Sequence, residues 1–108
     1  MSLDITLYAT IETEVYQGNI THNLGKMADE AGIYRALWRP EELFPNPSAK
    51  DLMPILKEGL KNLKSDPDYY KQFNPENGWG DYNGLVRFVT DYLNELESYP
   101  DARISACR

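Results

Sequence analysis

The sequence predicts an α+β fold in which the two ends of the chain form a small antiparallel sheet of two or three strands, covered by four or five helices. Three observations support this prediction. Apolar and polar residues alternate near both ends, the apolar spacing between them is that of helices, and hydrophobic residues make up 42% of the 108 residues. This length suits one domain, so we expect residues 1–108 to form a single α+β domain.

The predicted strands lie at the two ends of the chain. From Leu3 to Glu12 apolar and polar residues alternate, which is typical of a strand with one buried face. The segment Ala102–Cys107 repeats this pattern over a shorter length, so we expect the two strands to be antiparallel neighbours. Because two strands alone are only marginally stable, we expect a third strand, either from Thr13–Ile20 or from a second subunit.

The first helix is predicted to follow Thr21. Thr21 is a suitable N-cap, Gly32 is suitable just beyond the C-terminus, and apolar residues between them recur at helical spacing. A second, shorter apolar set begins at Ile33 and stops before Pro40, because the residue before a proline avoids helical geometry. The stretch from Arg39 to Ser48 contains three prolines and is expected to be a loop.

Two longer helices are predicted in the second half of the chain, at Ser48–Leu63 and Asp81–Ser98. Ser48 and Asp51 have the spacing of a capping box, and Asp81 is a good N-cap. Because Pro54 lies beyond a first turn, the earlier helix starts either near Ser48 with a distorted second turn or near Asp51, and we prefer the first alternative. We expect both helices to cover the apolar face of the sheet.

Between these two helices the sequence predicts a short helix and then tight turns. The Asp-Pro-Asp sequence at 66–68 combines an N-cap with a proline at the first helical position, so we expect a helix to about Phe73. Residues 74–80 are rich in Asn, Pro and Gly and are expected to form turns. Gly78 and Gly80 would let the Trp79 indole insert into the core, where its replacement by alanine would cost ~3–5 kcal/mol.

Charge and hydrophobicity argue against two classes of partner, nucleic acids and membranes. The chain has 11 Lys and Arg against 17 Asp and Glu, a net charge of −6, and its basic residues are scattered apart from Lys57, Lys61 and Lys64. Duplex-binding proteins usually carry a clustered basic face, so we expect no direct nucleic-acid partner. No apolar stretch approaches the ~18 residues of a membrane helix, and we expect neither a signal peptide nor a membrane partner. The single cysteine, Cys107, fits a reducing cytoplasm.

Motifs of the common enzyme classes are absent from the sequence. It contains no glycine-rich phosphate loop, no Gly-x-Ser-x-Gly and no His-Glu-x-x-His. The only histidine, His22, has no second histidine or nearby cysteine with which to share a metal, and Asp29 and Glu30 follow about two turns later. We therefore expect no metal and no cofactor, and we interpret His22 as a structural hydrogen-bonding residue.

Two polar clusters, the first at residues 19–23 and the second at residues 74–82, are candidate sites for binding a ligand or a partner. Amides beside aromatic faces suit a pocket for a small polar or planar ligand, and they equally suit a buried loop that must satisfy its own backbone. Both clusters precede predicted helices, so we expect them to lie close together, with Trp79 wedged between the helices and His22 near the rim. The candidate residues are Asn19, Thr21, His22, Asn23, Asn74, Asn77, Trp79 and Tyr82.

The same segments resemble a known family. The sequences Asn-x-Thr-x-Asn-x-x-x-Met at 19–27, Ala-Gly-Ile-Tyr at 31–34, Leu-Trp-Arg-Pro at 37–40 and Asn-Pro-x-Asn-Gly-Trp-Gly-x-Tyr at 74–82 are similar to those of small uncharacterised proteins encoded by phages and prophages. The resemblance extends from about Asn19 through nearly all the rest of the chain. That family has no established activity, so the resemblance implies a setting, the cytoplasm of a bacterial host, and no mechanism.

Three functional hypotheses follow from these observations. The leading one is a small, soluble, non-enzymatic binding module that acts on a host or phage protein or on a small ligand. The second is a small hydrolase or transferase that uses His22 in an amide- and aromatic-lined pocket. The third is a structural accessory protein that forms a homo-oligomer. A concave pocket with His22, Asn23 and Trp79 would favour ligand binding or catalysis, whereas a flat apolar patch would favour a protein partner.

Overall fold

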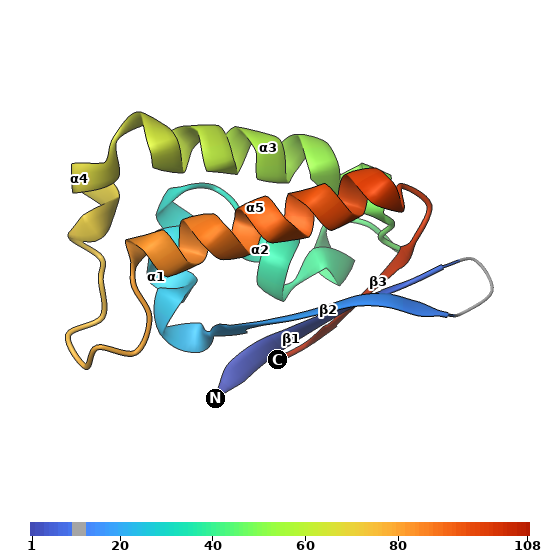
Figure 1. Ribbon diagram of the computed structural model, residues 1–108, viewed down its shortest axis with the longest axis horizontal. Helices are drawn as coiled ribbons and strands as arrows, with labels where there is room; N and C mark the ends of the chain where they lie inside the picture. The colour runs from blue at the N-terminus through green and yellow to red at the C-terminus, as the bar shows by residue number, and fades with distance from the viewer. Residues whose placement is uncertain (10–12) are drawn as a thin grey trace.

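The computed structural model describes residues 1–9 and 13–108, and within these ranges the chain forms three strands and five α-helices (Figure 1). The strands are β1 (Ser2–Tyr8), β2 (Glu14–Thr21) and β3 (Arg103–Cys107). The α-helices are α1 (Gly25–Glu30), α2 (Tyr34–Trp38), α3 (Ala49–Ser65), α4 (Pro67–Lys71) and α5 (Tyr82–Ser98). Two short 3-10 turns are η1 (His22–Leu24) and η2 (Pro40–Glu42). The predicted α+β class is confirmed.

The three strands form one antiparallel sheet in the order β2-β1-β3. Leu7 of β1 pairs with Tyr16 of β2 on one side and with Ile104 of β3 on the other. The predicted pairing of the first and last strands is therefore confirmed, and the third strand comes from this chain, close to the predicted range. β1 ends at Tyr8, whereas the predicted strand continued to Glu12; residues 10–12 lie outside the described part of the chain.

The helices lie on one side of the sheet, as Figure 1 shows. The side chains of Leu3, Ile5 and Leu7 in β1 are completely buried, as the alternating sequence predicts. Asp4 and Tyr8 belong to the opposite set of the alternation and remain partly exposed. The sheet thus contributes one apolar face to the core.

The helices are stacked in two layers above the sheet. α5 contacts β2, α2 contacts β3, and α3 packs across both of these helices. α3 and α5 run in opposite directions, with α3 farther from the sheet (Figure 1). The prediction that both long helices cover the sheet therefore holds directly for α5, whereas α3 covers mainly helices. Three strands ~4.8 Å apart are too narrow to hold α2 and two further helices, each ~10 Å across.

The two long helices begin where their capping residues predict. At the start of α3 the backbone N–H of Ser48 donates to Asp51 Oδ2 at 3.1 Å, which completes a capping box. α3 begins at Ala49, directly after the cap Ser48, as preferred above, and Pro54 lies inside it on its exposed side. At the start of α5 the backbone N–H of Gly84 donates to Asp81 Oδ1 at 2.7 Å.

The first predicted helix is divided into η1 and α1. Thr21 is still the cap, because its Oγ1 accepts a hydrogen bond from the backbone N–H of Asn23 at 3.3 Å. Gly32 has φ of +83°, as expected just beyond a helix C-terminus. The division occurs because Leu24 leaves helical geometry, with φ of −94° and ψ of 4°.

Two other short segments also differ from the prediction. α4 ends at Lys71 instead of near Phe73, and the side chain of Gln72 donates to the carbonyl of Tyr69 at 2.8 Å beside this end. The predicted loop after Arg39 contains the turn η2, which starts at Pro40. A proline at the first position has the φ angle that such a turn needs, which explains the extra turn.

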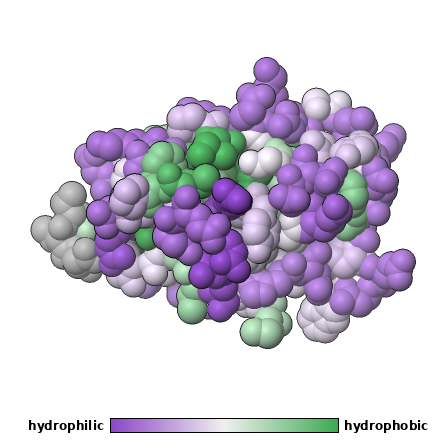
Figure 2. Space-filling view, turned by 180° about the vertical axis from the view of Figure 1, so that it is seen from behind, coloured by the Kyte–Doolittle hydropathy of each residue, from purple (hydrophilic) through white to green (hydrophobic). Residues whose placement is uncertain are grey.

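The surface seen from the opposite side is largely hydrophilic, in keeping with the net charge of −6 (Figure 2). One apolar area interrupts this surface near its middle (Figure 2). Over the residues that the structure describes, no helix combines the length and the apolar character needed to cross a membrane.

Candidate functional site

The two polar clusters meet where the loop before α5 packs on the end of β2. At Gly80 an added Cβ would lie 2.8 Å from Thr21 Cγ2 and 3.0 Å from Leu24 Cγ. Gly80 also has φ of +97°, which residues with a side chain rarely adopt. The prediction that the two clusters lie close together is confirmed by this contact, and the contact requires a glycine.

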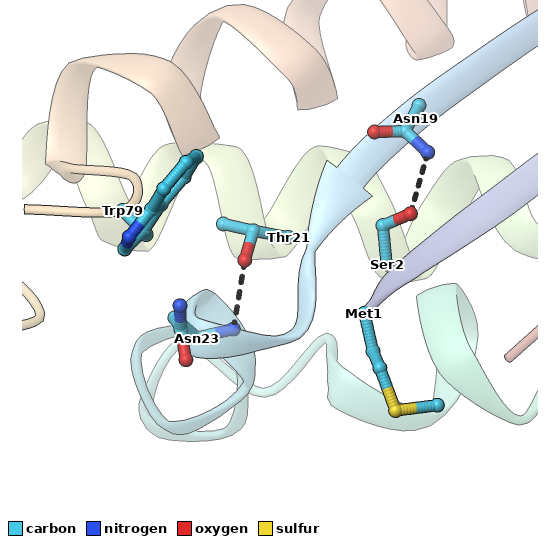
Figure 3. Close-up of a pocket in the computed structure, with 6 residues that line it drawn as sticks. All are labelled: Met1, Ser2, Asn19, Thr21, Asn23 and Trp79. Carbon is cyan, nitrogen blue, oxygen red and sulfur yellow. Dashed lines mark hydrogen bonds between the residues drawn. The ribbon is translucent and has the colours of Figure 1, made fainter.

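A cavity of about 470 Å³ lies beside this contact. Trp79, Thr21 and Asn23 lie toward one end of it, and the other lining residues lie toward the opposite end (Figure 3). The lining residues are Met1, Ser2, Asn19, Thr21, Asn23 and Trp79. The volume falls within the ~300–1,000 Å³ that is typical of small-molecule sites. Three predicted site residues of the first cluster and one of the second therefore share one cavity.

The cavity offers neutral hydrogen-bonding groups. Asn19 Nδ2 donates to Ser2 Oγ at 2.9 Å and to Asp4 Oδ1 at 2.6 Å, which uses both amide N–H donors and leaves the side-chain carbonyl as an acceptor. Thr21 Oγ1 accepts from the backbone of Asn23 and keeps its own O–H as a donor. The side-chain amide of Asn23 has no hydrogen-bond partner in the described part of the chain. No charged side chain is among the described residues that line the cavity.

Trp79 does not insert into the core, so the prediction that it is wedged between two helices is wrong. Its side chain is 70% exposed. The space beside Thr21 is occupied by the backbone of Gly80, and the positive φ angles of Gly78 and Gly80 turn the chain so that the indole projects outward. The large stability loss expected from its truncation therefore has no structural basis.

His22 lies beside the cavity in sequence, but its ring is turned toward the protein interior. The ring packs edge-on against Trp38, with 6.1 Å between the ring centroids. Nε2 of His22 is buried and forms no hydrogen bond within the described residues, so the interpretation of His22 as a structural hydrogen-bonding residue is wrong, and its ring is a packing group. No carboxylate in that part of the chain orients the imidazole, and the ring is not among the groups that line the cavity. These contacts do not supply the orienting partner that a general base needs.

The other candidate residues of the second cluster hold the loop in place. Asn77 Oδ1 accepts a hydrogen bond from the backbone N–H of Trp79 at 2.9 Å. Asn74 Oδ1 accepts one from the backbone N–H of Tyr82 at 2.8 Å. The Tyr82 hydroxyl is buried and donates to the carbonyl of Leu63 at 2.6 Å. These three side chains therefore shape the turn that presents Trp79, as the structural interpretation of the cluster expected.

Met1 and Ser2 line the cavity and were missed by the sequence analysis. They lie in or next to β1, and the register that pairs Ser2 with Thr21 brings them to the first cluster. No motif marks them, because only strand pairing places them there. Among the described residues, no group of three or more His, Cys, Asp or Glu side chains could hold a metal ion.

No protein-family model, curated protein or solved structure matches this chain. The function of the chain is therefore inferred from the geometry of the cavity.

Proposed function

We propose that this chain is a small, non-enzymatic binding module of phage or prophage type that acts in the host cytoplasm and binds a small neutral ligand in the cavity beside Trp79. The motifs at 19–27 and 74–82 support the phage setting. The position of Trp79 supports the ligand site, and it is the observation that carries the proposal.

An exposed indole at the edge of a polar cavity is suited to binding. Trp79 leaves about 70% of its side chain in water, although indoles contribute strongly to stability when they are buried. Asn77 holds the turn that presents the indole, and two glycines give it the positive φ angles it needs, so the backbone beneath the ring needs little ordering when a ligand binds. Tryptophans in such positions often dominate binding energy.

The lining groups define the chemistry of the ligand. The indole face favours a flat ring, and the side chains of Asn19, Thr21 and Asn23 offer an acceptor, a donor and an amide. None of the side chains of the described lining residues is charged, so hydrogen bonds and the indole face would bind a neutral ligand. A neutral ring compound with several hydroxyl or amide groups fits these requirements.

Tryptophan fluorescence tests this proposal. The chain has two tryptophans, and Trp38 is only 2% exposed, so solvent-sensitive changes in emission report on Trp79. We would titrate the protein with neutral pyranoses and with the nucleosides adenosine and uridine. Binding should shift the emission of Trp79 to shorter wavelength and protect it from acrylamide.

Two variants distinguish binding at Trp79 from binding at another exposed aromatic residue. Trp79→Ala should weaken binding at least ~5-fold, because stacking of one ring on an aromatic side chain contributes ~1–3 kcal/mol, with binding then followed by amide NMR shifts. Tyr99→Ala removes another exposed aromatic, which lies outside the cavity, and should leave affinity unchanged. If no probe binds at millimolar concentration, or if both variants behave alike, the proposal is wrong.

A further inference from the structure

A second concave surface lies between the two long helices, far from the residues of the Trp79 cavity. It is a groove of about 340 Å³, which we call the α3/α5 groove. α3 contributes Leu60 and the three lysines Lys57, Lys61 and Lys64, and α5 contributes Leu93. The lysines are four and three residues apart, so they follow one face of α3 and form a basic rim beside an apolar floor.

The basic rim is only partly neutralised. Lys57 Nζ lies 3.6 Å from Glu97 Oε1 on α5, in an exposed pair that contributes little to stability. Lys61 and Lys64 form no ion pair within residues 1–9 and 13–108, and both are exposed. Two positive charges therefore remain along α3 in a protein whose net charge is −6.

The α5 side of the groove carries the neutral polar residues Thr90 and Asn94 and the carboxylate of Glu97. The Thr90 hydroxyl donates to the carbonyl of Val86 at 2.7 Å, so its hydrogen bond is used within the helix. Asn94 follows Thr90 on the same face, and Glu97 lies at the far end, opposite Lys57. The groove thus has a basic side on α3 and, on α5, a side with two neutral residues and one carboxylate, above the Leu60 and Leu93 floor.

We propose that the α3/α5 groove binds an acidic amphipathic helix of a protein partner. The apolar stripe of such a helix would cover Leu60 and Leu93, and its carboxylates would face Lys61 and Lys64, which is the helix-in-groove mode of recognition. The lining residues span 57–64 on α3 and 90–97 on α5, ~12 Å along each helix, so about two turns of a partner helix would lie against them.

This charge arrangement favours an acidic helix over a nucleic acid. Glu97 lines the groove together with the three lysines, and Glu58 on α3 adds a second carboxylate outside the lining. A polyphosphate would be repelled by these carboxylates and would gain nothing from an apolar floor. A peptide helix can place apolar residues on the floor and acidic residues only beside the basic rim.

The test uses two synthetic 18-residue helical peptides. Both carry leucines on one face, and the flanking positions are glutamate in the acidic peptide and lysine in the basic one. In amide NMR spectra of the whole chain, the acidic peptide should shift signals of residues 57–64 and 90–97. It should bind at least tenfold more tightly than the basic peptide, and its affinity should fall as salt is added.

Charge-reversal variants test whether Lys61 and Lys64 contribute to binding of the acidic peptide. The double variant Lys61→Glu with Lys64→Glu should weaken binding of the acidic peptide at least tenfold and strengthen binding of the basic peptide. The control Lys26→Glu with Lys50→Glu makes the same charge change outside the groove and should still bind the acidic peptide more tightly than the basic one. Leu60→Ala, which keeps the charge, should also weaken binding. Equal binding of the two peptides, absence of binding at millimolar concentration, or identical effects of the two double variants would overturn the proposal. If duplex DNA or anionic phosphatidylserine vesicles shift the same signals more strongly than the acidic peptide, the groove binds polyanions or membranes instead.

Discussion

The contact between Gly80 and the end of β2 can be tested with one methyl group. In Gly80→Ala the new Cβ would lie 2.8 Å from Thr21 Cγ2 and 3.0 Å from Leu24 Cγ, and the residue would keep φ near +97°. A positive φ costs a residue with a side chain ~1–2 kcal/mol, and overpacking costs a further ~1–3 kcal/mol. We therefore expect Gly80→Ala to lower the free energy of unfolding by ~2–5 kcal/mol.

Gly78→Ala is the matched control. Gly78 has φ of +78° in the same turn, but an added Cβ would meet no atom within 4 Å. This variant should lose only the backbone contribution, ~1–2 kcal/mol. The difference between the two variants therefore measures the packing of the loop on β2 and η1.

Urea denaturation, followed by far-UV circular dichroism, gives both free energies of unfolding. The slope of the transition should stay the same, so that the midpoint reports stability. Thermal melting should agree, because 1 kcal/mol corresponds to about 4 °C or more in a domain of this size. If the two alanine variants are equally destabilised, the close contact at Gly80 does not exist, and the argument that joins the two polar clusters fails with it.

The remaining predictions concern three aromatic side chains, Trp79, Tyr92 and Tyr69. Trp79→Ala should change the free energy of unfolding by less than ~1 kcal/mol, because the indole is mostly exposed; a loss above ~3 kcal/mol in urea denaturation would mean that the ring is buried after all. Tyr92→Phe should be neutral or slightly stabilising, since the Tyr92 hydroxyl is buried with no hydrogen bond among the described residues, and marked destabilisation would reveal a partner. Burial also raises the pKa of Tyr92, so absorbance titration should show no ionisation of this residue while the fold persists. Tyr69→Phe should raise the pKa of the Glu30 carboxyl, because the Tyr69 hydroxyl donates to Glu30 at 2.6 Å and, with Lys26, holds that pKa below its usual value. Because the pKa of Glu30 is lower in the folded state, its ionised carboxylate stabilises the fold slightly at pH values above the ordinary carboxyl pKa. This stabilisation is lost as the pH falls through the folded-state pKa. A carbon NMR titration of the Glu30 carboxyl that gave the same pKa in variant and parent would show that the hydrogen bond is absent.

Part of the candidate site could be predicted before the fold was known. Asn19, Thr21 and Asn23 stand out as a dense group of hydrogen-bonding side chains, and the glycines around Trp79 indicate a sharp turn. The structure brings these segments together. The direction in which Trp79 points could not be predicted, because glycine permits the turn without deciding which side chain the turn buries.

Other parts of the functional surfaces depend on contacts between distant residues. Ser2 reaches the cavity only because β1 pairs with β2 in the observed register. The ring of His22 is turned inward because Trp38, 16 residues later, provides an aromatic surface for it. The spacing of Lys57, Lys61 and Lys64 was visible in the sequence, but their position beside Leu93 depends on how α3 packs on α5.

The amino-acid sequence by itself determined the class of the fold and the starts of its main helices. The alternation around Ile5 and the caps at Ser48 and Asp81 act through neighbours one to four residues away, so they can be recognised without coordinates. Tertiary structure alone decided that Trp79 is exposed, that Gly80 must be a glycine and that α3 and α5 enclose a groove. These features depend on which distant segments meet, about 60 residues apart for Thr21 and Gly80 and about 30 for Leu60 and Leu93, and that choice is made by packing of the whole core and not by any local pattern.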